Sequence, residues 1–326
     1  MIVRPELQAL RSNDAPQRTA QAAIRDVYEG WRHNGLGRQA EAELVQFGRG
    51  AEIDDLPLLA TLFASGEDRA ALRFVASLVD PLLQAMARQP LSQAPLRYSS
   101  DQSATSLSLV RKGTTTLTLQ VINGTGQDRK PDPVSARFVP AETFERVLAG
   151  TGSVRRVSML AQWPDGADLQ VRDVALAPGD VSLRMGQSEV QLVSRVPATL
   201  ALLKLQRRVC EGTVTREYAL ADGRLVHQSA SSPRESRLEL TAALLGRMGR
   251  SDAAPLLAAL AEEDGSESLR WQSLRECLAL DTAAGFATLC RIAQRSDDRL
   301  AVPAGALRAQ LLETYPQLAG ASQCPA

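Results

Sequence analysis

The side chains best suited to acid–base chemistry in this sequence are His227 and Tyr218. His227 alternates with Leu225 and Ser229 along a predicted strand, so we expect these three residues to share one face of a sheet. An imidazole acts as a general base when a carboxylate orients it within hydrogen-bond reach of a substrate. The phenol of Tyr218, on the preceding predicted strand, is the candidate partner. We favour a packing role for His227, the commoner role of a single histidine in a strand.

A second group of residues suits recognition rather than catalysis. Trp271 lies next to Arg270 and four residues before Arg275 in a predicted helix. Tryptophan and arginine are enriched at binding hot spots, so these three side chains are the predicted binding residues. The alternative is that Trp271 fills a groove between the helices and the β region.

The carboxylates Glu142 and Glu145 stand three residues apart behind Pro140. This spacing predicts a helix whose first turn presents both side chains on one face. Glutamates are favoured near a helix N-terminus by its dipole, so we expect a solvated helix end. A paired-carboxylate site is the alternative.

The thiols show neither C-x-x-C spacing nor the density of a disulfide scaffold. We expect reduced, mostly buried side chains, because no histidine lies near in sequence to activate Cys277 or Cys290. The four cysteines are Cys210, Cys277, Cys290 and Cys324.

Other chemistry has no motif in the sequence. No G-x-S-x-G elbow occurs, and the glycine pairs near residues 124 and 150 lack the strand–glycine–helix context of a phosphate loop. We therefore predict no cofactor. Lys+Arg and Asp+Glu both total 37, so the net charge is zero, which argues against general nucleic-acid binding. We saw no signal-like segment and no apolar run of membrane-spanning length, and we predict a cytoplasmic protein.

Helical periodicity marks both ends of the chain. Apolar residues in the segment 16–31 recur at i, i+3, i+4 and i+7, with Pro16 in the first turn. Further helices are expected at residues 38–47, after Pro57, and from Glu67 onward, where Pro81 should kink or restart the helix. The remaining predicted helices cover residues 236–248, a segment from 252, and residues 268–280, 282–295 and 303–314.

Strand periodicity fills the middle of the chain. About ten short strands at even spacing, with turn residues between them, are typical of an antiparallel barrel or sandwich. Asp222-Gly223 supplies the positive φ of the last hairpin turn. The predicted strands are a hairpin within residues 106–122 and segments 135–139, 154–160, 169–175, 181–184, 189–195, 199–206, 214–220 and 224–229.

The turn Pro178-Gly179-Asp180, followed by returning strands up to Leu205, resembles the corresponding turn of cupin-type jelly rolls. This resemblance covers about residues 95–230, and the helical pairs of residues 236–314 resemble HEAT-like hairpins. The cupin resemblance implies an antiparallel jelly roll, which in metal-binding members holds a divalent ion on histidines and a carboxylate.

The metal positions that this resemblance implies depart from the family pattern. After Gly186 the chain has Gln187, Ser188 and Glu189, none of them histidine. The whole sequence contains two histidines, His33 and His227, too few for a histidine-rich site. We therefore predict no bound metal.

The predicted fold class is α+β: an antiparallel cupin-like barrel or jelly roll flanked by helical units. We expect an N-terminal helical unit (residues 1–94), a β domain (95–232) and C-terminal HEAT-like helices (233–326). The first functional hypothesis is a non-catalytic binding or accessory protein whose partner is a small molecule, a peptide or another protein. The alternatives are a cupin-type enzyme built around His227, and a structural homo-oligomer. We predict no membrane partner.

Overall fold

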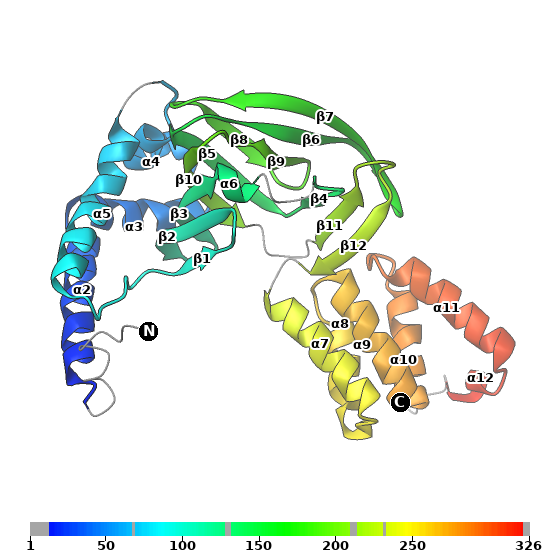
Figure 1. Cartoon of the computed structure of the whole chain (residues 1–326). Coiled ribbons are helices and arrows are strands. Elements are labelled where there is room, and N and C mark those ends of the chain that lie inside the picture. Colours follow the sequence, from blue (N-terminus) through cyan, green and yellow to red (C-terminus); the bar gives the residue numbers. More distant parts are fainter. Residues whose placement is uncertain (1–12, 67–68, 128–131, 209–213, 231–232, 322–326) are drawn as a thin grey trace, which may run out of the picture. The chain divides into compact units, whose positions relative to one another are not determined.

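The computed structural model describes residues 13–66, 69–127, 132–208, 214–230 and 233–321. The chain forms two compact units, whose elements are labelled in Figure 1. The first unit comprises Met1–Val209 and Ala219–Arg224, and the second comprises Cys210–Tyr218 and Leu225–Ala326. These units divide the chain differently from the three predicted parts. No boundary falls near residue 94, because the N-terminal helices and a β-sheet share one apolar core.

The helices of the first unit form mainly where the sequence predicts them. They are α2 (Ala15–His33), α3 (Gly35–Gly48), the 3-10 turn η1 (Ile53–Asp55), α4 (Pro57–Leu62), α5 (Ala70–Arg88) and the short α6 (Gly124–Gln127). The buried carboxylate of Glu43 in α3 accepts hydrogen bonds from the backbone N–H groups of Leu58 (3.1 Å) and Leu59 (2.9 Å). A side chain from another helix thus caps the first turn of α4.

Helix α5 corrects two expectations. It runs through Pro81 without a break, so the predicted restart does not occur. It is also long and apolar enough to cross a membrane by length and composition alone, whereas we expected no such segment. In this fold its apolar stripe, Ala71, Phe74, Leu78 and Leu82, is buried in the core that the helices share with the sheet.

A six-stranded antiparallel sheet, sheet A, has the order β1-β2-β3-β10-β5-β8. Its strands are β1 (Tyr98–Ser100), β2 (Ala104–Lys112), β3 (Thr115–Asn123), β10 (Thr199–Arg208), β5 (Ala141–Ala149) and β8 (Val181–Met185). One face of the sheet packs against the helices through apolar residues such as Phe144, Leu203 and Leu205. The same unit contains β4 (Ser135–Phe138).

Strand β5 lies where the sequence predicted a helix, and that prediction is wrong. β5 pairs with β10 on one side and with β8 on the other. Its residues are buried on both faces up to Leu148. A strand covered on both faces needs no alternation of polar and apolar residues, so the period that reveals a strand is missing here.

A three-stranded antiparallel sheet, sheet C, has the order β7-β6-β9. Its strands are β6 (Gly152–Trp163), β7 (Gly166–Leu176) and β9 (Glu189–Arg195), and Figure 1 shows β6 and β7 as long neighbouring strands. Sheets A and C pack face to face through a second apolar core, formed by Ile122, Val147, Val154, Leu176, Val196, Leu200 and Leu202. This pairing confirms the α+β class with antiparallel sheets.

The predicted Pro-Gly-Asp turn is present between β7 and β8. Gly179 has a φ of +89°, a conformation that favours glycine. The Gly179 N–H donates to the carbonyl of Val147 (2.9 Å), and the carboxylate of Asp180 accepts from the Ala177 N–H (2.7 Å). The turn is therefore fixed to strand β5.

The second unit contains five main helices and most of a hairpin, whose turn at residues 219–224 belongs to the first unit. The hairpin strands are β11 (Val214–Ala219) and β12 (Leu225–Ala230), joined through Gly223 with a φ of +69° as predicted. The helices lie close to their predicted bounds, and their HEAT-like character stays a prediction. They are α7 (Pro233–Arg247), the 3-10 turn η2 (Ser251–Ala253), α8 (Ala254–Glu262), α9 (Glu267–Leu280), α10 (Thr282–Gln294), α11 (Ala301–Thr314) and the short α12 (Leu318–Ala321).

Candidate functional site

A groove of about 600 Å³ opens in the helical part of the second unit. Trp271 and Arg275 lie on its wall, one turn apart on α9, because residues at i and i+4 share a helix face. The groove is lined by Trp271, Arg275, Leu278, Thr282, Leu307, Leu311, Tyr315, Gln317 and Leu318. Two of the three predicted binding residues are thus brought together. The apolar residues of α11 that complete the site were missed.

Packing fixes the walls of this groove. Trp271 and Leu278 are half-buried, and they contact the apolar core that joins α9, α10 and α11 around Phe286 and Leu289. Helix α9 starts at a defined residue because the Ser266 hydroxyl accepts from the Leu269 N–H (3.4 Å). A concave, largely apolar wall with a few polar groups is typical of small-molecule sites.

Arg275 is the charged residue among the described residues that line the groove, and none of those residues is a carboxylate. Its side chain is exposed, and within the described parts of the chain it makes no hydrogen bond or ion pair. The groove thus pairs an apolar body with one uncompensated positive charge.

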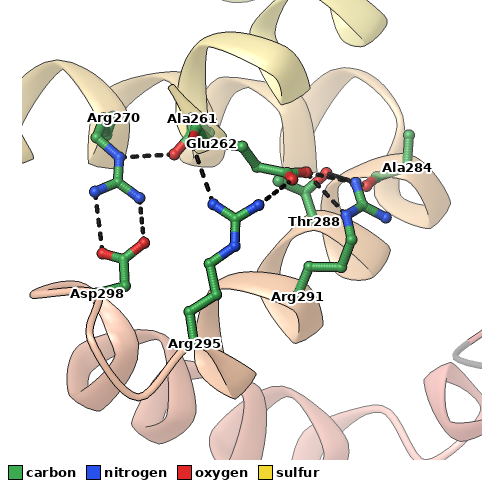
Figure 2. A network of polar contacts seen from close by, with 8 residues as sticks. All are labelled: Ala261, Glu262, Arg270, Ala284, Thr288, Arg291, Arg295 and Asp298. Atoms are coloured by element: carbon green, nitrogen blue, oxygen red, sulfur yellow. Dashed lines mark hydrogen bonds and ion pairs between the residues drawn. The ribbon is translucent and has the colours of Figure 1, made fainter. Parts of the chain in front are cut away.

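Arg270 is not part of this groove, although it neighbours Trp271 in the sequence. Its guanidinium is buried and forms a two-point ion pair with Asp298 (3.0 and 2.5 Å) while Nε donates to the carbonyl of Ala261 (2.9 Å) (Figure 2). Hydrogen bonds from Arg270 lower the pKa of Asp298 below its usual value. Arg270 therefore ties α9 to the segment before α11 and is not available to a ligand.

A second group of ion pairs, around Glu262, lies beside the Arg270–Asp298 pair (Figure 2). The Glu262 carboxylate accepts from Arg291 of α10 (2.6 Å) and from Arg295, the residue that follows α10 (2.9 Å), and Figure 2 shows both arginine side chains reaching Glu262. The network holds the helices that form the groove, and it uses arginines that would otherwise suit an anionic ligand.

A second polar centre lies between sheets A and C, at Glu145 of β5. The strand register places Glu145 directly opposite Lys204 of β10. Its carboxylate pairs with Lys204 Nζ (2.8 Å) and Arg184 Nη2 (2.5 Å), and accepts from Gln191 Nε2 (3.0 Å). Burial raises the pKa of Glu145, but the charges of Lys204 and Arg184 and their hydrogen bonds outweigh it, so its pKa lies below its usual value.

The two carboxylates predicted to share a helix face lie on opposite faces of the sheet, as residues three apart on a strand must. Glu142 faces the helices, where it pairs with Arg207 Nε (2.8 Å). Glu145 faces a cavity of about 140 Å³ between the sheets, with room for a few waters. The alternative prediction of a paired-carboxylate site at Glu142 and Glu145 is therefore wrong.

The residues at the positions implied by the cupin resemblance do not fit a divalent metal. Glu189 is ion-paired with Arg156 (2.9 Å), and Ser188 donates to the carbonyl of Met185 (3.2 Å). Across the described segments no group of three or more His, Cys, Asp or Glu side chains is placed to hold a metal ion. We derive no metal-dependent step.

His227 and Tyr218 do not form an acid–base pair. His227 is exposed and lies opposite Glu217, whereas Tyr218 is fully buried and lies opposite Leu225. A β-bulge inserts Val226 and breaks the alternation that was expected to align His227 with Leu225. Burial raises the pKa of the Tyr218 phenol. His227 lines neither the groove nor the cavity between the sheets.

The thiols are placed for packing. Cys277 is buried, and its thiol lies 3.5 Å from the carbonyl oxygen of Ala254. Burial raises the pKa of Cys277, which opposes a nucleophilic thiolate. Cys290 is half-buried in the same helical unit. Cys210 and Cys324 lie outside the described residues.

No family model and no curated protein matches the sequence. Matching solved structures include a cupin superfamily protein from Desulfitobacterium hafniense (12% identity, 34% of this chain, 83% of that chain, TM-score 0.23). KdgF from Halomonas sp. is another (10% identity, 35% and 89% coverage, TM-score 0.25). Ectoine synthase from P. lautus is a third (9%, 34% and 67%, 0.23). The packing of sheets A and C is established by the pairing of this chain's own strands and by the apolar core between them.

Proposed function

We propose that this protein is a non-catalytic binding protein whose helical groove holds a small molecule with an apolar body and one anionic group. The observation that carries the proposal is Arg275, which makes no ion pair and is the one charged side chain among the described residues that line a groove of about 600 Å³. This volume falls within the range of ligand sites, about 300–1,000 Å³.

Different residues of the groove would contact the apolar and the anionic parts of such a ligand. Leu278, Leu307 and Leu311 cover its apolar part, and Trp271 adds an aromatic surface. The guanidinium of Arg275 presents several N–H donors in a planar fork, which suits a carboxylate. A neutral ligand would leave that charge without a partner.

A catalytic role has less support. The buried carboxylate of Glu145 is held in ion pairs that lower its pKa, which makes it a poor general base near neutral pH. His227 is exposed and lies away from Tyr218. A cupin-type enzyme remains the alternative function, but His227 and Tyr218 do not form the acid–base pair that it would use.

Two probes with the same chain length test the proposal: decanoate, which is charged, and decanol, which is not. Isothermal titration calorimetry should show tighter binding of decanoate. Arg275→Gln should weaken the binding of decanoate about tenfold or more, the cost of one hydrogen bond to a charged group, and leave the binding of decanol unchanged. Arg275→Lys should retain part of the preference.

Arg308→Gln is the matched control, since Arg308 is an exposed arginine of α11 outside the groove lining. It should bind both probes like the wild type. Failure of both probes to bind, or equal loss of decanoate affinity in Arg308→Gln and Arg275→Gln, would remove the proposal. Turnover in a broad substrate screen would favour the enzyme.

A further inference from the structure

A cleft of about 510 Å³ lies in the first unit, between helix α2 and strand β2. Three segments line it: α2 through Tyr28 and Arg32, the link 95–97 before β1, and β2 through residues 108–112. The Tyr28 hydroxyl donates to the carbonyl of Leu109 (3.3 Å) and joins helix and strand at the base of the cleft. This cleft is separate from the groove of the second unit.

Among the described residues that line the cleft four are cations, and none is a carboxylate. They are Arg32, Arg97, Arg111 and Lys112. The whole chain has no net charge, so this concentration of one sign is local. Its potential attracts anions.

Two carboxylates outside the lining neutralise two of these cations. Glu41 of α3 accepts from Arg32 Nε (2.7 Å) and also pairs with Lys112, and Glu29 lies 3.3 Å from Arg32 Nη1. The hydrogen bond from Arg32 is the main cause that lowers the pKa of Glu41 to about 2. Glu41 is thus charged at neutral pH and already engaged.

The other two cations of the cleft are Arg97 and Arg111. Both are exposed, and neither side chain makes a hydrogen bond or ion pair within the described segments. Four cations less two carboxylates leave a charge of +2 around the cleft. Arg97 and Arg111 lie on neighbouring segments that line the same hollow, because the Ser108 N–H of β2 donates to the Arg97 carbonyl (2.8 Å).

We propose that the cleft between α2 and β2 binds a small phosphate monoester, with Arg97 and Arg111 holding the phosphate. Such a group carries about −1.5 to −2 charges at neutral pH, which matches the uncompensated charge. Its oxygens accept two-point hydrogen bonds from guanidinium forks. The volume exceeds that of phosphate alone and leaves room for a short organic moiety. A hollow, as opposed to a flat basic surface, favours a small molecule over a nucleic acid.

Calorimetry of the full chain with glycerol 3-phosphate tests the assignment, with glycerol and succinate as uncharged and equally charged comparisons. We expect saturable binding of glycerol 3-phosphate, weaker binding of succinate and none of glycerol. Binding should weaken as NaCl is raised from about 0.05 to about 0.5 M. The double variant Arg97→Ala/Arg111→Ala should bind at least about tenfold more weakly.

Arg73→Ala is the matched control, because Arg73 is an exposed arginine of α5 outside the cleft lining. It should bind like the wild type, and all variants should melt at similar temperatures. Three results would overturn the proposal: unchanged affinity in the double variant, equal affinity for succinate, or binding of a single-stranded RNA 12-mer with no binding of glycerol 3-phosphate. The decanoate experiment on Arg275 is unaffected by any of them.

Discussion

Replacement of Glu145 by glutamine should destabilise the first unit by about 3 kcal/mol at neutral pH. The change keeps the shape of the side chain and removes its charge. Arg184 and Lys204 then face each other without a counterion, and their side chains are 10% and 29% exposed. Removing one partner of a buried ion pair costs about 3–5 kcal/mol. We take the lower end because Lys204 can regain part of its hydration.

The pH dependence of this effect has a defined sign. The folded-state pKa of Glu145 lies below its ordinary value of 4.5. A carboxylate of this kind contributes stability that is complete above its unfolded pKa and is lost as pH falls through the folded one. The difference in unfolding free energy between wild type and Glu145→Gln should therefore be constant near neutral pH and become smaller only below pH 4.5.

Urea unfolding followed by circular dichroism measures the change, and hydrogen exchange of peptides from β5 and β10 assigns it to the first unit. Glu52→Gln is the control, an exposed glutamate without an ion pair among the described residues, and it should shift stability by less than about 0.5 kcal/mol. Adding Lys204→Met to Glu145→Gln should restore part of the loss. Two results would show that the buried ion pair does not stabilise the fold: equal stability of Glu145→Gln and Glu52→Gln, or a double variant whose loss equals the sum of the losses in Glu145→Gln and Lys204→Met.

Three further predictions follow from single contacts. Arg270→Met should lower the free energy of unfolding of the second unit by about 3 kcal/mol, because it leaves the buried Asp298 without its ion-pair partner. Arg299→Met removes an ion pair whose side chains are 82% and 52% exposed, so it should cost under about 1 kcal/mol in the same urea assay. Gly150→Ala should lower the melting temperature more than Gly50→Ala, since both have positive φ but only at Gly150 would a Cβ lie 1.9 Å from a carbonyl oxygen, that of Thr199. His227→Ala should change stability by less than about 0.5 kcal/mol in thermal scans, because the side chain is exposed; a large loss would show a packing role.

The elements that sequence predicts well here are those whose pattern is local. Helices α9 and α10 are preceded by the N-cap residues Ser266 and Asp281, whose side chains accept hydrogen bonds from first-turn N–H groups. The hairpin turn at Gly223 was also identifiable, because its positive φ requires a residue of that type. Neither inference needed a contact from distant parts of the chain.

The residues that line the groove were predicted in part, and helix geometry explains which part. Arg275 lies four residues after Trp271, about 40° around the helix, so the two share a face. Arg270 lies about 100° from Trp271, and it turns toward Asp298 in the core. Adjacency in sequence grouped all three residues, whereas the helical period would have separated Arg270. The leucines of α11 that face them come from a separate helix and left no pattern near Trp271.

The centre at Glu145 lay beyond local inference, and its contacts bear on function. Gln191 is 46 residues away in sequence, and Lys204 meets Glu145 only through the register of β5 and β10. Once assembled, the cluster holds the carboxylate ionised, because two cations compensate for its burial. A general base needs a pKa near the working pH. The contacts that hold the Glu145 carboxylate between the sheets therefore also make it a poor base. Arg97, Arg111 and Arg275, whose exposed side chains make no ion pair among the described residues, are better placed to meet a ligand.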